Sequence, residues 1–146
     1  MKTLCLKLRL SLIILLFLSS CRIHLVAPYS AALSARIDST YTMVDRFYLQ
    51  MLEKTTDSAE GRAYSKFTDD YINIEVELNS LYMQNRIRPL NKNSTRIAQI
   101  ALQKWIDYKE DHKKRKTISD AAIRLNRRYM ADLFYTMRVA EEAKQE

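Results

Sequence analysis

Residues that permit tight turns are scarce in this chain. Gly61 is the only glycine, and Pro28 and Pro89 are the only prolines among 146 residues. Sheets depend on tight hairpin turns, and these turns favour glycine because they need positive φ angles. The sequence therefore favours long helices joined by few connections.

Apolar residues recur at helical spacing in four segments, with steps of three and four residues alternating. The four stripes are Leu33, Ile37, Tyr41, Val44, Tyr48 and Met51; Tyr64, Phe67, Tyr71, Ile74, Leu78 and Leu81; Ile97, Ala101, Trp105 and Tyr108; and Ile123, Met130, Leu133, Phe134, Met137 and Ala140. One segment conflicts with this pattern, because residues 72–78, INIEVEL, alternate as a strand would, and Ile and Val favour strands. Since the helical spacing continues on both sides, we predict a helix there.

Capping signals set the expected helix boundaries. Pro89 disfavours helical geometry at Arg88 and so ends the second helix. Ser119 is the clearest start signal, because Ile118 before it and Ile123 after it can form a hydrophobic staple. The helices are predicted over about 30–56, 58–87, 94–113 and 119–144.

Two further helix starts are less sharply marked. Asp57 with Glu60, or Ser58 beside it, can cap the second helix, and Ser94 can cap the third. Four helices with connections of a few residues predict an all-α domain over 30–146, folded as an antiparallel up-down four-helix bundle.

The N-terminal residues have the layout of a secretory signal. Lys2, Lys7 and Arg9 precede an apolar run whose strongest part is Leu12 to Leu18. Crossing a bilayer takes roughly 20 apolar residues, so this run is too short to span one. A charged start, a short apolar stretch and small residues before a break are typical of a cleaved signal peptide.

The break itself is more specific, because Leu18-Ser19-Ser20-Cys21 resembles the lipobox of bacterial lipoprotein precursors. This resemblance implies that a diacylglycerol is attached to the Cys21 thiol, that residues 1–20 are removed, and that the new amino terminus is acylated. Residues 21–29 then form a lipidated tether. A conventional cleaved signal and an uncleaved anchor or buried helix are the alternatives. No family is recognised for the rest of the chain.

Export changes the composition of the mature chain. The precursor has 24 basic and 17 acidic residues, a formal charge of +7. Three of the basic residues leave with the signal, so the mature chain carries an unremarkable +4. Cys5 is removed and Cys21 is acylated, which leaves no thiol for a disulfide or a nucleophile.

Metal and cofactor sites lack their usual motifs. Carboxylate-bridged metal pairs in bundles use Glu-x-x-His, but the residue three before His112 is Lys109, and His24 lies in the tether. A haem held by His112 and a methionine is the alternative; the available methionines are Met43, Met130 and Met137. We interpret His112 as the end of the third apolar stripe and predict no metal and no cofactor.

The sequence also argues against an enzyme. A nucleophile elbow, an oxyanion hole or a phosphate-binding loop is usually shaped by glycines, and Gly61 alone cannot shape one. The acidic residues on the second helix are read as a solvated face rather than as an acid–base pair; they are Asp69, Asp70, Glu75 and Glu77.

Basic residues gather at two connections. The run KKRK and the next helix supply the candidate partner-binding residues, which are Lys113, Lys114, Arg115, Lys116 and Arg124. Such a run is typical of nucleic-acid binding, but export favours an acidic partner outside the cytoplasm, which can be anionic lipid, an acidic glycan or another envelope protein. A merely solvated turn is the plain alternative. The second-to-third connection supplies the candidate lipid-headgroup contacts, which are Arg86, Arg88, Lys92 and Arg96.

The tether gives these two basic groups different roles. About eight residues separate Cys21 from the first helix, which limits its reach to roughly 30 Å. In an up-down bundle the second-to-third connection then lies on the membrane side and KKRK points away.

One modification motif is also present. The triplet Asp57-Ser58-Ala59 resembles an acceptor site for O-glycans on exported proteins, with Ser58 as the acceptor.

These observations predict a lipid-anchored cell-envelope protein, a non-catalytic accessory or adaptor that binds a partner near the membrane. Alternatives are a periplasmic ligand-binding or chaperone-like bundle and, should the signal interpretation fail, a basic nucleic-acid-binding protein. Arg22, rather than Asp, follows the cysteine, and no acidic residue follows closely. By analogy with lipoprotein sorting, this favours the periplasmic face of the outer membrane.

Overall fold

A computed structural model describes residues 25–55 and 58–145. Four long helices make up most of this part of the chain, and it contains no strand, so the predicted all-helical class is confirmed. The helices are α2 (Ala31–Lys54), α3 (Thr68–Arg86), α4 (Lys92–Arg115) and α5 (Asp120–Glu142), with a short 3-10 helix η1 (Tyr64–Lys66) before α3. The predicted signal peptide and Cys21 lie outside the described residues.

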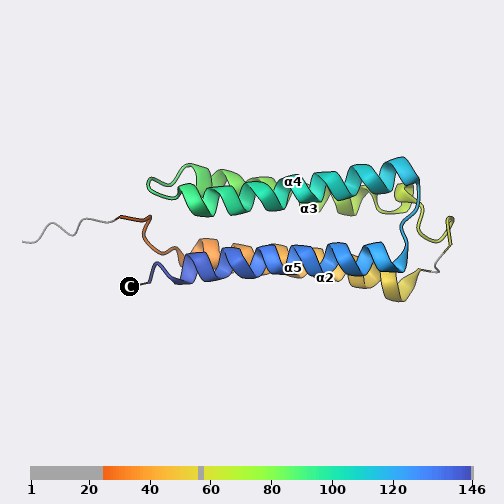
Figure 1. Cartoon of the computed structure of the whole chain (residues 1–146), viewed down its shortest axis with the longest axis horizontal. Coiled ribbons are helices and arrows are strands. Elements are labelled where there is room, and N and C mark those ends of the chain that lie inside the picture. The colour runs from red at the N-terminus through yellow and green to blue at the C-terminus, as the bar shows by residue number, and fades with distance from the viewer. Residues whose placement is uncertain (1–24, 56–57, 146) are drawn as a thin grey trace, which may run out of the picture.

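The helices pack side by side as a bundle of two layers, α3 with α4 and α2 with α5 (Figure 1). The backbones of α2 and α3, and those of α4 and α5, also lie close together, whereas among the described residues the backbone of α2 does not come close to that of α4, nor that of α3 to that of α5. These last two pairs are therefore the diagonals of the bundle.

The connections divide between the two ends of the bundle (Figure 1). One end, called here the tether end, holds residues 25–30, the 87–91 connection and residues 143–145 after α5. The other, called the far end, holds residues 58–67 and the 116–119 connection.

The predicted stripes form the core. Trp105 is fully buried in its middle, and its indole nitrogen donates to the backbone oxygen of Tyr71 at 3.1 Å. The rings of Phe47, Tyr48 and Tyr71 surround it with centroids 5.2 to 5.9 Å away. These aromatic contacts join α2, α3 and α4 in one layer of the core.

Residues 72–78 are helical, as the flanking spacing predicts. Ile74 and Leu78 are buried in the core, whereas Ile72 and Val76 are exposed on the outer face of α3. The alternation of INIEVEL therefore reflects an apolar outer stripe and not a strand.

Side-chain caps begin two of the helices. The Ser119 hydroxyl accepts from the amide of Ala122 at 3.3 Å, and Ile118 and Ile123 are both buried beside it, which confirms the predicted start. Ser30 caps α2 in the same way, by accepting from the amide of Leu33 at 3.3 Å.

The second helix begins later than predicted, at Thr68 rather than at residue 58. The Ser58 hydroxyl does accept from the Gly61 amide at 2.9 Å, but this bond closes a turn and starts no α-helix. Arg62 is buried, and the Tyr64 amide donates to the Lys116 carbonyl at 3.1 Å. These tertiary contacts hold residues 58–64 against the end of α4. Asp57, the other proposed cap, lies outside the described residues.

The third helix also differs from its prediction. It begins at Lys92, after Asn91, so Ser94 lies inside the first turn and is not the cap. The Ser94 hydroxyl instead accepts from the Lys144 ammonium at 2.9 Å. At the other end α4 runs to Arg115, and Lys116 ends it in a left-handed conformation with φ of 65°.

Candidate functional site

Polar residues continue the apolar stripes of α3 and α5 into the tether end. Asn85 comes four residues after Leu81, and Glu141 comes four residues after Met137, so each occupies a core position. Both are buried, and only 1% of Glu141 is exposed. Sequence reasoning missed them, although their spacing was a signal that a polar group enters the core here.

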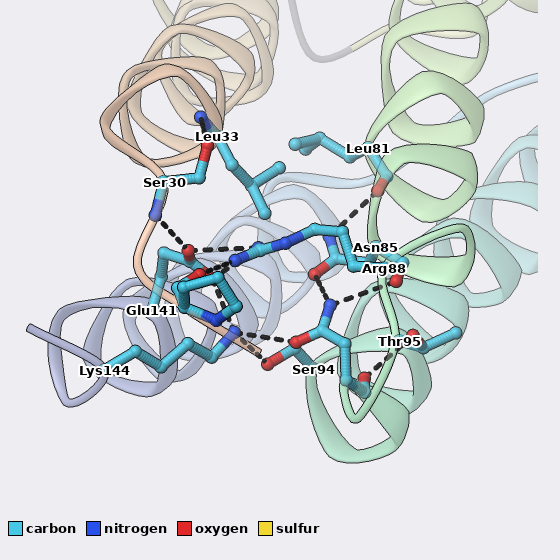
Figure 2. A network of polar contacts seen from close by, with 11 residues as sticks. Ser30, Leu33, Leu81, Asn85, Arg88, Ser94, Thr95, Glu141 and Lys144 are labelled. Carbon is cyan, nitrogen blue, oxygen red and sulfur yellow. Dashed lines mark hydrogen bonds and ion pairs between the residues drawn. The ribbon is translucent and has the colours of Figure 1, made fainter. Parts of the chain in front are cut away.

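The Glu141 carboxylate is satisfied from three directions (Figure 2). It accepts from Arg88 Nη1 at 3.0 Å through both oxygens, from Lys144 Nζ at 2.6 Å, and from the Ser30 amide at 2.8 Å. Burial alone raises the pKa of Glu141, but these three donors outweigh it and leave the pKa below its ordinary value. The carboxylate is therefore held as a buried anion between two cations.

The contacts of Lys144 extend this network to α3 and α4. Its ammonium donates to Asn91 Oδ1 at 2.7 Å as well as to Ser94. Asn91 Nδ2 in turn donates to Asn85 Oδ1 at 2.9 Å, and Asn85 Nδ2 donates to the Leu81 carbonyl at 2.9 Å. We refer to these residues as the Glu141 cluster; its members are Ser30, Asn85, Arg88, Asn91, Ser94, Glu141 and Lys144.

The Glu141 cluster fastens the segment that leads into α2. Arg88 Nη2 donates to the Pro28 carbonyl, and the Ala27 amide donates to the Leu90 carbonyl at 3.3 Å. Together with the Ser30 bond to Glu141, these contacts tie residues 27–30 to the α3–α4 connection and to the end of α5. The direction in which the chain enters the bundle is thereby fixed.

The predicted headgroup residues fall into two groups. The Arg88 side chain is largely buried and is engaged by Glu141 and the Pro28 carbonyl, so its guanidinium belongs to the Glu141 cluster. Arg86, Lys92 and Arg96 are exposed and form no ion pair with any described residue. The Arg88 contact with Glu141 spans 53 residues of sequence, and local spacing gives no sign of it.

Two clefts open at the tether end. One, of about 440 Å³, is lined by Arg86, Lys92 and Arg96 together with Leu90 and polar neighbours. The other, of about 460 Å³, is lined by Leu25, Leu90 and Lys92 among others. Basic and apolar side chains therefore share this surface.

The predicted partner-binding residues lie at the far end, and all five are exposed. Arg115 pairs with Asp111 at 2.7 Å and Arg124 approaches Asp120 at 3.8 Å, each one turn away on its own helix. Lys113, Lys114 and Lys116 form no ion pair with the described residues; this leaves their positive charges unpaired at the end of α4. Ser58 is exposed at the same end, with its hydroxyl accepting from Gly61.

His112 is buried at the far end and both of its ring nitrogens are occupied. Nε2 lies 2.8 Å from the Arg62 carbonyl, which can only accept, so this nitrogen carries the proton. Nδ1 then accepts from the Tyr71 hydroxyl at 3.1 Å. Burial lowers the pKa of His112 and outweighs the bond to Arg62, so the neutral ring is favoured.

This arrangement shows His112 in a structural role. In the part of the chain that the structure describes, no group of three His, Cys, Asp or Glu side chains is placed to hold a metal ion. Over the same residues, no helix combines the length and the apolar character that crossing a bilayer requires.

Comparisons with protein-family models, with curated proteins and with solved structures find no match.

Proposed function

We propose that this protein is a lipid-anchored cell-envelope protein, an accessory or adaptor without catalytic activity that holds a partner near the membrane. In this proposal the bundle is an antiparallel up-down bundle, and residues 21–29 are the tether that leaves the acylated Cys21. The observation that carries it is the fastening of residues 27–30 to the Glu141 cluster, at the end of the bundle opposite the KKRK run.

Tether length sets the height of the body above the bilayer. Four residues lead from Cys21 to Leu25, the first described residue, and they reach about 14 Å at most. Because residues 27–30 are bonded to the bundle, little further slack is available. The tether end then faces the lipid, on the periplasmic side of an outer membrane.

Basic residues on the tether end support this orientation. Arg86, Lys92 and Arg96 are exposed beside the attachment of the tether, where they can meet anionic headgroups. Each such contact is worth about 1 kcal/mol close to the surface and is screened by salt.

The length of the helices then sets how far from the bilayer the partner is bound. Helix α4 has 24 residues, and at about 1.5 Å per residue it spans roughly 36 Å. Lys113, Lys114 and Lys116 therefore stand about one bundle length from the bilayer, where their unpaired charges suit an acidic protein or an acidic glycan. Arg115 and Arg124 add positive charge that acidic neighbours partly balance.

Two experiments test the proposal. Fatty-acid labelling in cells should mark the wild-type protein, and the Cys21→Ala variant should stay unlabelled and unprocessed. Labelling of the variant would refute the proposed lipid anchor at Cys21. Photo-crosslinkers at Lys114 should capture a protein or a glycan, whereas those at Lys92 should capture lipid. Capture of protein at Lys92 and of lipid at Lys114 would reverse the orientation.

A cleft between α2 and α5 supports a second candidate function, the binding of a small apolar ligand. It measures about 370 Å³, and its lining includes Tyr41, Phe134 and Tyr135 as well as the ion pair of Asp38 with Arg138 at 3.3 Å. This volume lies at the lower end of the range for small-molecule sites. Native mass spectrometry of protein purified from the cell envelope should then show an added ligand mass, and its loss in Phe134→Ala would locate the ligand.

A further inference from the structure

The tether end carries exposed apolar side chains that the core does not use. Leu25 is 82% exposed, Ile87 76% and Leu90 61%, and Val26 beside them is also exposed. Leu25, Val26 and Leu90 line one cleft. Ile87 belongs to the same connection, immediately after α3. Four large apolar residues are thus gathered at one end of an elongated molecule.

The far end has a different surface. Its two connections, residues 58–67 and 116–119, contain no exposed large apolar residue, although Lys113, Lys114 and Lys116 are exposed close by. Basic residues without an ion-pair partner therefore occur at both ends. Only at the tether end do the described connections also carry a cluster of exposed apolar residues.

The positive charge of the tether end favours an anionic partner for this surface. Arg86, Lys92 and Arg96 line the same cleft as Leu90 and form no ion pair with the described residues. Of the two described acidic residues at the end of α5, Glu141 is buried and already neutralised by Arg88 and Lys144, and Glu142 pairs with Arg138. The surface thus offers apolar side chains inside a positive border, the pattern that interfacial membrane contacts use.

We propose that Leu25, Val26, Ile87 and Leu90, bordered by Arg86, Lys92 and Arg96, form a docking face that inserts into the interface of an anionic bilayer. The inference deepens the proposed function and rests on it, because the short tether from Cys21 brings this face to the bilayer. The anchor then supplies attachment, and the docking face supplies orientation: the bundle stands on its tether end instead of swinging about a lipidated residue.

The absence of a free thiol in the mature chain makes the test direct, since a single introduced cysteine carries the probe. The acylated protein is reconstituted into vesicles of phosphatidylethanolamine and phosphatidylglycerol, with an environment-sensitive fluorophore at Ile87→Cys or Leu90→Cys. The matched control is Ile72→Cys, which is also an exposed apolar position on α3 but lies towards the far end. Quenchers are carried on the lipid chains.

We expect blue-shifted emission and lipid quenching at residues 87 and 90, and neither at residue 72. On these vesicles, the ratio of docked to undocked protein should fall about fivefold for each cation removed in Arg86→Gln, Lys92→Gln and Arg96→Gln. The matched charge control, Lys113→Gln with Lys114→Gln and Lys116→Gln, should leave the ratio unchanged.

Three outcomes would overturn the docking face. The first is that the acylated protein binds the vesicles but the probes at 87 and 90 remain exposed to water. The anchor would then hold, and the docking face would be refuted. Equal quenching at residue 72 would mean that the bundle lies on its side. Shielding at 87 and 90 in whole cells but not on vesicles would assign the face to a protein.

A failure of the anchor itself is distinguishable. If fatty-acid labelling shows that Cys21 is not acylated, the proposed function fails. The same probes on the full chain carrying Cys5→Ser and Cys21→Ser, mixed with anionic vesicles, then read the docking face alone: insertion at 87 and 90 would support it, and its absence would overturn it.

Discussion

Glu141, on the last turn of α5, shares both carboxylate oxygens with one guanidinium nitrogen of Arg88, in the α3–α4 connection, at 3.0 Å. The two residues are 53 positions apart, and the same carboxylate also accepts from the amide of Ser30. One buried anion therefore joins the start of the first helix, the middle connection and the end of the last helix.

Removing this charge should destabilise the bundle strongly. Glu141→Gln keeps the size of the side chain but leaves Arg88 and Lys144 with no buried anion between them, and breaking a buried pair costs about 3 to 5 kcal/mol. The free energy of unfolding, from urea titration, should fall by about that amount. The control is Glu142→Gln, whose carboxylate pairs with Arg138 in solvent, and its effect should stay below about 1 kcal/mol.

The Glu141 carboxylate should also make the stability of the bundle fall at acid pH. Because its pKa is lowered in the folded state, its contribution is present above its unfolded pKa and is lost as the pH falls through the folded pKa. Urea midpoints should therefore drop below about pH 4.5 in the wild type more than in Glu141→Gln. Parallel pH profiles for the two proteins would contradict the role assigned to the anion.

His112 should add a second, milder pH dependence. Burial lowers its pKa, so the unfolded chain takes up the proton first, and stability is lost as the pH falls below about 6.5. The free energy of unfolding should decline between pH 7.5 and 5.5, and His112→Gln should remove most of that slope. The second histidine, His24, lies outside the described residues and is kept in both proteins, so the difference between them isolates His112.

Arg88 should govern the order of the segment before α2. Arg88→Lys keeps the charge, but a single ammonium cannot reproduce the fork that bonds both Glu141 and the Pro28 carbonyl. Hydrogen exchange at the amides of Ala27 and Ser30 should speed up while core amides of α4 stay protected. Arg86→Lys, two residues away and exposed, should change neither.

Two neighbouring positions on α3 should separate core from surface. Leu78 is 1% exposed and Val76 is 60% exposed, although both belong to the strand-like INIEVEL segment. Leu78→Asp should abolish cooperative unfolding, because an unpaired charge in the core is among the costliest substitutions. Val76→Asp should leave the far-UV circular dichroism and the midpoint nearly unchanged. Equal damage from both would mean that the outer face of α3 is covered.

The sequence by itself determined that four helical segments form and which faces they bury, but not the residue at which α3 begins. Periodic stripes such as the one through Tyr71, Ile74 and Leu78 are local, because a helix places residues three and four apart on one side wherever it forms. The cap at Ser119 was also readable, since all its partners lie within four residues.

Tertiary structure alone decided the polar contacts at both ends. Residues 58–64 form a turn instead of a helix because Arg62 is buried there and Tyr64 bonds to Lys116, 52 residues later. Ser94 serves Lys144 instead of capping α4 for the same kind of reason. A cap or a stripe is set by neighbours in sequence, whereas the partner of a buried charge is set by whichever chain segment the packed helices bring beside it.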